Sequence, residues 1–156
     1  MTVGVTSYSI ALTGGWLVDG TGAPPMRADV ALAGDRIAAV GRIDAAEAVT
    51  TVDVAGRYVL PGMIDTHAHI DALAADPDIA AAALHQGVTT LIGGQDGISF
   101  APAGARAIAD VDRYFSAVNG PCPTPLAGGC TVADLLDFYD DHAHINVACT
   151  APAGDR

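Results

Sequence analysis

Two histidines separated by a single residue, His67 and His69, follow an apolar segment that begins with Leu60-Pro61-Gly62-Met63-Ile64. Side chains alternate between the two faces of a strand, so a strand through this segment places Asp65, His67 and His69 on one face. Two imidazoles on one face can each give a nitrogen to a single zinc-like ion. We therefore predict that His67 and His69 are metal ligands, and the alternative is a histidine pair in an ordinary turn.

Asp65 is expected to point the same way as the two histidines. Its carboxylate is then placed to accept a hydrogen bond from one imidazole and so to orient that ring. A buried strand residue with its own hydrogen bonds is an equally open interpretation. His142 and His144 have the same spacing as the first pair, but Asp140-Asp141 before them are typical of a solvated helix end, and we do not expect them to bind a metal.

The residues before this segment alternate weakly between apolar and polar types, which is typical of short strands. The clearest hairpin is centred on Gly34-Asp35, a pair with glycine first that suits a two-residue turn. Residues 1–60 are therefore predicted to form a small antiparallel β domain. The expected strands lie within residues 8–18, at 28–33 and 36–40, and at 51–54 and 58–60.

After the histidines, helical and extended segments alternate. Asp76-Pro77 is a strong helix start, and Thr131 with Asp134 resembles a capping box before a second helical run. Alternation of this kind predicts an α/β fold with parallel strands, as at the start of a (β/α)8 barrel. The expected elements are a helix from 76 to 86, strands at 88–92 and 145–149, and helices over 105–118 and after 131. Residues 61–156 supply about three of eight barrel strands, so we expect an N-terminal fragment of a longer enzyme.

The composition excludes several classes of protein. The 156 residues are 51% hydrophobic, which is enough for a folded core, and the longest apolar stretch, residues 79–84, is too short for a membrane span. No signal peptide is evident, so a cytoplasmic protein is predicted.

The formal charge of −11 makes nucleic acid and anionic membranes poor partners, and the absence of lysine rules out lysine chemistry within these residues. Cys122, Cys130 and Cys149 form no metal-type pair and are taken as structural.

Four sequence motifs together suggest a family. They are Val18-Asp19-Gly20-Thr21-Gly22-Ala23-Pro24, the histidine segment at 61–69, Gln86-Gly87-Val88-Thr89-Thr90, and Gly97-Ile98-Ser99-Phe100-Ala101-Pro102. With these motifs the chain resembles the amidohydrolase superfamily, and more narrowly its N-acyl-D-amino-acid deacylase (D-aminoacylase) branch. The resemblance implies that residues 1–60 are part of a β-sandwich, that residues 61–156 begin a (β/α)8 TIM barrel, and that one or two zinc ions bind at the carboxyl ends of the barrel strands.

The resemblance also assigns roles to individual residues. His67 and His69 match the ligand pair of the first barrel strand, and Asp96 stands where this branch typically has a zinc-binding cysteine. A carboxylate is also a competent zinc ligand, so Asp96 is predicted to replace the thiolate or to bridge two ions. The alternative is that Asp96-Gly97 is only a turn.

The activity implied by the resemblance is metal-assisted hydrolysis of a linear amide, most simply the deacylation of an N-acyl-D-amino acid by a zinc-activated water. The general base and the remaining histidine ligands of the family are expected beyond Arg156, so these 156 residues alone are expected to be inactive. Two alternatives within the enzyme class are hydrolysis of cyclic amides, as in dihydroorotases or hydantoinases, and deamination. From another class, a truncated metal-binding protein without catalysis also fits the sequence.

Overall fold

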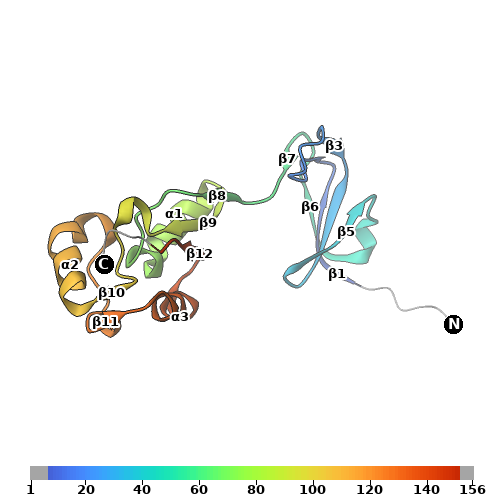
Figure 1. Cartoon of the computed structure of the whole chain (residues 1–156). Coiled ribbons are helices and arrows are strands. Elements are labelled where there is room, and N and C mark those ends of the chain that lie inside the picture. Colours follow the sequence, from blue (N-terminus) through green and yellow to red (C-terminus); the bar gives the residue numbers. More distant parts are fainter. Residues whose placement is uncertain (1–6, 152–156) are drawn as a thin grey trace. The chain divides into compact units, whose positions relative to one another are not determined.

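A computed structural model describes residues 7–151 of the chain (Figure 1). Contacts divide the chain into two compact units, Met1–Pro61 and Gly62–Arg156. Each unit has its own sheets, and each is described by itself below.

The first unit is built from short strands in two sheets. A four-stranded sheet has the order β5-β4-β1-β6, and a three-stranded sheet has the order β3-β2-β7. A 3-10 turn, Ala45–Glu47, precedes β6. The strands are β1 (Tyr8–Thr13), β2 (Trp16–Leu17), β3 (Met26–Arg27), β4 (Asp29–Ala33), β5 (Arg36–Gly41), β6 (Ala48–Asp53) and β7 (Tyr58–Val59).

The predicted hairpin is confirmed, but the prediction of a purely antiparallel domain is wrong. β4 and β5 pair antiparallel around Gly34-Asp35, and Gly34 has the positive φ of 62° that this turn needs. However, β1 pairs parallel with β6 and β2 pairs parallel with β7. β1 and β2 also lie in different sheets. Local alternation indicates that a segment is a strand, whereas partner and direction depend on residues far away in the sequence, here about 40 positions on.

The second unit is an α/β fold around a three-stranded parallel sheet with the order β12-β9-β8. A small antiparallel pair, β10 with β11, lies outside that sheet. The elements are β8 (Met63–Asp65), α1 (Pro77–His85), β9 (Val88–Gly93), β10 (Ala103–Gly104), α2 (Ala105–Asn119), β11 (Gly129–Cys130), α3 (Val132–His142) and β12 (Asn146–Cys149), with 3-10 turns at Leu73–Ala75, Gln95–Gly97 and Thr124–Leu126.

The βαβ unit between β8 and β9 follows from local signals. The Asp76 carboxylate accepts a hydrogen bond from the Asp78 N–H, and Pro77 occupies the first turn of α1, where a missing N–H costs nothing. Gly87 has a φ of 82° just after the helix, so the chain can reverse into β9. The predicted helix and the β-branched strand after it are both confirmed.

One prediction near the histidines is wrong. The strand expected to run through residue 69 ends at Asp65, and neither histidine belongs to β8. The reason is local, because the Asp65 carboxylate accepts a hydrogen bond from the backbone N–H of His67 at 3.0 Å and turns the chain out of its extended course. Asp65, His67 and His69 therefore do not share a strand face.

The core of the second unit joins the sheet, the helices and the loop after β9. α2 and α3 contribute Ile108, Val111, Leu135 and Tyr139, while the loop contributes Phe100 and Ala101, both fully buried. The remaining buried members of this core are Ile70, Ala74, Ala80, Leu91, Leu126, Cys130 and Ile145.

None of the helices in residues 7–151 is long and apolar enough to cross a membrane.

Helix α3 starts with a complete capping box, which gives a direct test of its local stability. The Thr131 hydroxyl accepts a hydrogen bond from the Asp134 N–H, and the Asp134 carboxylate accepts one from the Thr131 N–H. We expect Thr131→Ala to lower the free energy of unfolding by about 1 kcal/mol, because the first turn of α3 loses its cap. Thr131→Ser retains the hydroxyl, so its free energy of unfolding is expected to fall much less. Urea unfolding followed by circular dichroism measures both, and equal losses would contradict the capping role.

Candidate metal centre

Two loops at one edge of the parallel sheet carry the predicted site residues. The first, residues 66–72, follows β8 and contains both histidines; we call it the histidine loop. The second, residues 94–102, follows β9 and contains Asp96; we call it the Asp96 loop. Because β8 and β9 run parallel, their carboxyl ends lie at the same edge, and loops that follow them are neighbours.

The three predicted ligands converge on one another. Nε2 of His67 lies 3.3 Å from Oδ2 of Asp96, and Nε2 of His69 lies 3.2 Å from the same oxygen. The two rings meet edge to face, with centroids 5.6 Å apart. His67 and Asp96 are each 59% exposed at the side chain, whereas His69 is 24% exposed. The group is therefore accessible from solvent, and His69 is the most buried of its three side chains.

The spacing of these atoms fits a single metal ion. Ligands at about 2.0 to 2.1 Å from a tetrahedral zinc lie about 3.3 Å from one another. The two nitrogen-to-oxygen distances match that value, and the ligand atoms of the three residues all lie within 4.8 Å of one another. Two imidazoles and one carboxylate are also a donor set that zinc uses in proteins. The residues present thus fit the predicted ion.

The structure places the Asp65 carboxylate against the backbone of the histidine loop. Its recorded contact is with the N–H of His67, and the residue is exposed. This hydrogen bond shapes the backbone turn that carries His67.

Asp96 occupies a turn, as one of the two alternatives raised from the sequence expects, and its side chain also faces the histidines. It lies in the 3-10 turn Gln95–Gly97 with a φ of 58°, a left-handed conformation that aspartate tolerates better than most residues. The side-chain amide of the preceding Gln95 donates to the carbonyl oxygens of Thr66 and Ile92, each at 3.1 Å. These bonds connect the base of the Asp96 loop to the histidine loop.

Asp71, a residue not predicted from the sequence as part of the site, is 1% exposed. Its Oδ2 accepts hydrogen bonds from the Ser99 hydroxyl and from the Phe100 N–H at 2.9 Å. Burial raises the pKa of Asp71, while the bonds from Ser99 and Phe100 and the charge of a protonated His69 act in the opposite direction. The available signal in the sequence was one acid within the otherwise apolar run Ile70-Asp71-Ala72-Leu73.

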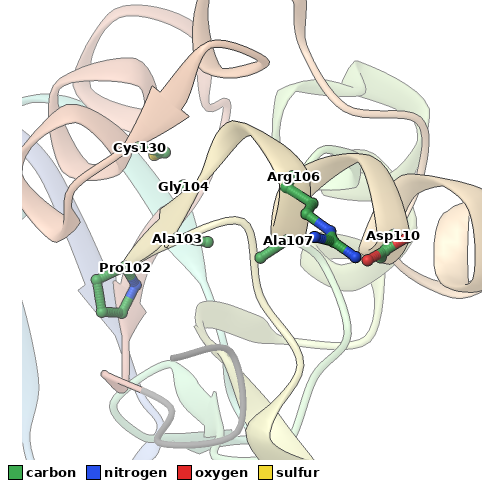
Figure 2. A pocket seen from close by; sticks show the side chains of 7 residues that line it. All are labelled: Pro102, Ala103, Gly104, Arg106, Ala107, Asp110 and Cys130. Atoms are coloured by element: carbon green, nitrogen blue, oxygen red, sulfur yellow. The ribbon is translucent and has the colours of Figure 1, made fainter.

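The other reactive side chains in residues 62–151 lie outside this group. The His142 ring packs against Phe138 and bonds the Phe138 carbonyl oxygen, as expected of a helix-end residue. Figure 2 shows a concave surface at the start of α2, lined by Pro102, Ala103, Gly104, Arg106, Ala107, Asp110 and Cys130. Burial and then the charge of Asp134 raise the pKa of Cys130 to about 11, so its thiol is protonated at neutral pH.

Comparison with known proteins agrees with this arrangement. The profile of the Amidohydrolase family matches residues 50–149, which include the three converging side chains and the whole parallel sheet. The chain belongs to the amidohydrolase family. This membership is consistent with the position of the three candidate ligands at the carboxyl edge of a parallel sheet, where α/β enzymes place their sites.

Two curated relatives of this amidohydrolase come from Alcaligenes xylosoxydans xylosoxydans. A D-aminoacylase is 45% identical over 149 residues, and an N-acyl-D-glutamate deacylase is 39% identical over 128 residues. The alignments cover 91% and 73% of this chain but only 28% and 26% of those relatives. The chain thus spans about a quarter of the length of the curated relatives it matches.

Two solved structures of deacylases are also similar to this chain. The N-acyl-D-glutamate deacylase of Bordetella bronchiseptica, solved with zinc and a phosphonate that mimics the tetrahedral intermediate, is 33% identical with a TM-score of 0.76. A D-aminoacylase studied for its binuclear metal centre is 35% identical with the same TM-score. They cover 96% and 95% of this chain, and the chain covers 30% of each.

Proposed function

We propose that this chain supplies the zinc-binding portion of a hydrolase that removes the acyl group from N-acyl-D-amino acids. The observation that carries the proposal is the convergence of His67, His69 and Asp96 on one point at the carboxyl edge of the parallel sheet. The relatives named as deacylases, and the zinc recorded in one of them, support the choice of metal and of reaction.

In this proposal His67 and His69 bind the ion through Nε2, and Asp96 binds it through Oδ2. Asp65 holds the backbone of His67 in the turn that directs its ring toward Asp96. Zinc in such a site supplies Lewis-acid chemistry, because it polarises an amide carbonyl and makes water nucleophilic near neutral pH. A carboxylate has two oxygens, so Asp96 also offers a way to hold a second ion.

We also propose that β8, β9 and β12 are the opening strands of a (β/α)8 barrel and that residues 1–60 belong to a β-sandwich. The parallel order β12-β9-β8 with helices between the strands supports the barrel, and two small sheets in the first unit support the sandwich. The outer strands β8 and β12 have unpaired edges within residues 7–151, and barrel strands elsewhere in an enzyme pair at such edges.

The test is hydrolysis of N-acetyl-D-amino acids by the protein that carries these residues, prepared with zinc. We expect hydrolysis of N-acetyl-D-amino acids in preference to hydantoins and dihydropyrimidines, and loss of activity after His67→Ala. The 156-residue chain assayed alone is expected to bind zinc without turnover. Preferred hydrolysis of a cyclic amide would contradict the substrate proposal, and turnover by the 156 residues alone, abolished by His67→Ala, would contradict the need for further residues.

A second candidate reaction is deamination. Adenine deaminases from Rhizobium meliloti and Agrobacterium fabrum are 36% and 40% identical over 91 and 90 residues of this chain. The same preparation incubated with adenine separates the two reactions, because deamination releases ammonia and deacylation releases a carboxylic acid. Tight binding of zinc with no reaction on any of these substrates would favour a metal-binding protein instead.

A further inference from the structure

We propose that Asp71 is a positioning residue that holds the Asp96 loop against the histidine loop. Because of this contact, the three metal ligands already lie in their binding positions before an ion binds. The contact between Asp71 and Ser99 does not depend on the proposed function, but its consequence for metal binding rests on it. Asp71 lies in the histidine loop two residues after His69, whereas Asp65 precedes that loop.

The contacts of Asp71 cross from one loop to the other. Its Oδ2 accepts the Ser99 hydroxyl at 2.5 Å and the Phe100 N–H at 2.9 Å, and Ser99 Oγ in turn accepts the Ala101 N–H at 3.2 Å. Ser99, Phe100 and Ala101 are all fully buried. A single carboxylate oxygen therefore fixes a stretch of backbone in the Asp96 loop, three to four residues beyond the ligand.

Gln95 makes the corresponding connection on the other side of Asp96. Its amide donates to the Thr66 carbonyl oxygen at the start of the histidine loop. Asp96 thus lies between two cross-loop contacts, with Gln95 immediately before it and Ser99 three residues after it. Three residues of chain span at most about 10 Å, so the position of Asp96 is tightly limited when both contacts are made.

Stability alone does not account for a carboxylate at this position. An acid that is 1% exposed loses most of its hydration, and the two hydrogen bonds that it accepts offset that loss only in part. What the carboxylate supplies is direction, because it accepts hydrogen bonds from two donors of the facing loop. Metal ligands need placement to within about 0.5 Å, and buried hydrogen bonds behind the ligands are the usual means.

The experiment uses the whole 156-residue chain and two variants, Asp71→Asn and Ser99→Ala, each of which removes part of the cross-loop contact with little change in volume. Ile108→Val is the matched control, because it trims a fully buried side chain of the same core on α2. Two quantities are measured: amide hydrogen exchange of the metal-free chain, and the Kd for zinc by competition with a chromophoric chelator.

Both variants are expected to speed exchange at least about 10-fold in residues 66–70 and 97–101, with α2 and α3 unchanged. They are also expected to weaken zinc binding about 10-fold, the lower end of the range for groups that orient metal ligands. Ile108→Val is expected to change neither the local exchange nor the Kd. If Asp71 had a purely structural role, its variants would instead lose amide protection throughout the second unit, and Ile108→Val would show a similar general loss.

The outcomes separate this inference from the proposed function. If the unaltered chain binds no zinc, the metal proposal fails, and exchange in the metal-free chain still decides whether Asp71 joins the loops. If zinc binds but Asp71→Asn and Ser99→Ala retain full loop protection and the original Kd, the positioning role is refuted while the metal site stands. Equal effects from Ile108→Val would also refute it.

Discussion

Replacing His69 by alanine is expected to weaken zinc binding more than about 100-fold. Loss of a group that only orients a ligand costs 10- to 100-fold in affinity, and removing the ligand itself costs more. Among the three candidate ligands, His69 has the least exposed side chain, and its Nε2 lies 3.2 Å from Asp96 Oδ2. Its removal leaves His67 and Asp96, two ligands with exposed side chains that make a poor zinc site.

The measurement is a zinc titration of the unaltered chain and the variant at pH 7, with circular dichroism to show that both are folded. His85→Ala is the matched control, because His85 is an exposed histidine on the last turn of α1 that takes no part in the site. We expect His85→Ala to bind zinc like the unaltered chain. A His69→Ala variant that keeps its affinity, or a His85→Ala variant that loses it equally, would contradict the assignment.

Local signals in the sequence predicted the helices α1, α2 and α3 and the strands β9 and β12 of the second unit well, whereas the strand expected through the histidines was wrong. Asp76-Pro77 and the Thr131 capping box are complete within four residues, and each begins a helix where predicted. Such contacts depend only on near neighbours, so they can be read from the sequence. The parallel pairing of β1 with β6 could not, because their cross-strand partners, such as Ile10 and Thr50, are 40 positions apart.

The residues of the candidate site were predicted from their types, but the strand geometry expected for them was wrong. His67 and His69 converge with Asp96 as expected, yet they do so from a turn, since an aspartate side chain competed with the strand for a backbone N–H. The position of Asp96 came from its resemblance to a family, because a residue 27 positions after His69 has no local link to it. Asp71 and Gln95 were missed for the same reason, as their partners lie 28 and 29 residues away.

The Asp96 loop also contributes to the core, which leads to the second large effect. Phe100 is the largest fully buried side chain among residues 7–151, although it belongs to a loop. Phe100→Ala is expected to lower the free energy of unfolding by about 3 to 5 kcal/mol, because it leaves a cavity that close-packed neighbours fill only in part. The free energy of unfolding of a whole folded domain is about 5 to 15 kcal/mol, so this one loop residue accounts for a large share of the stability.

Phe115→Ala on α2 is the matched control, since the same side chain there is 37% exposed and its removal creates no enclosed cavity. Urea unfolding of the metal-free variants measures both, and we expect the loss at Phe100 to exceed the loss at Phe115 severalfold. Equal losses would mean that the loop packs loosely. A large difference would mean that the backbone bearing Asp96 can shift only by disrupting the core, so the rigidity of the candidate site and the stability of the unit depend on the same side chain.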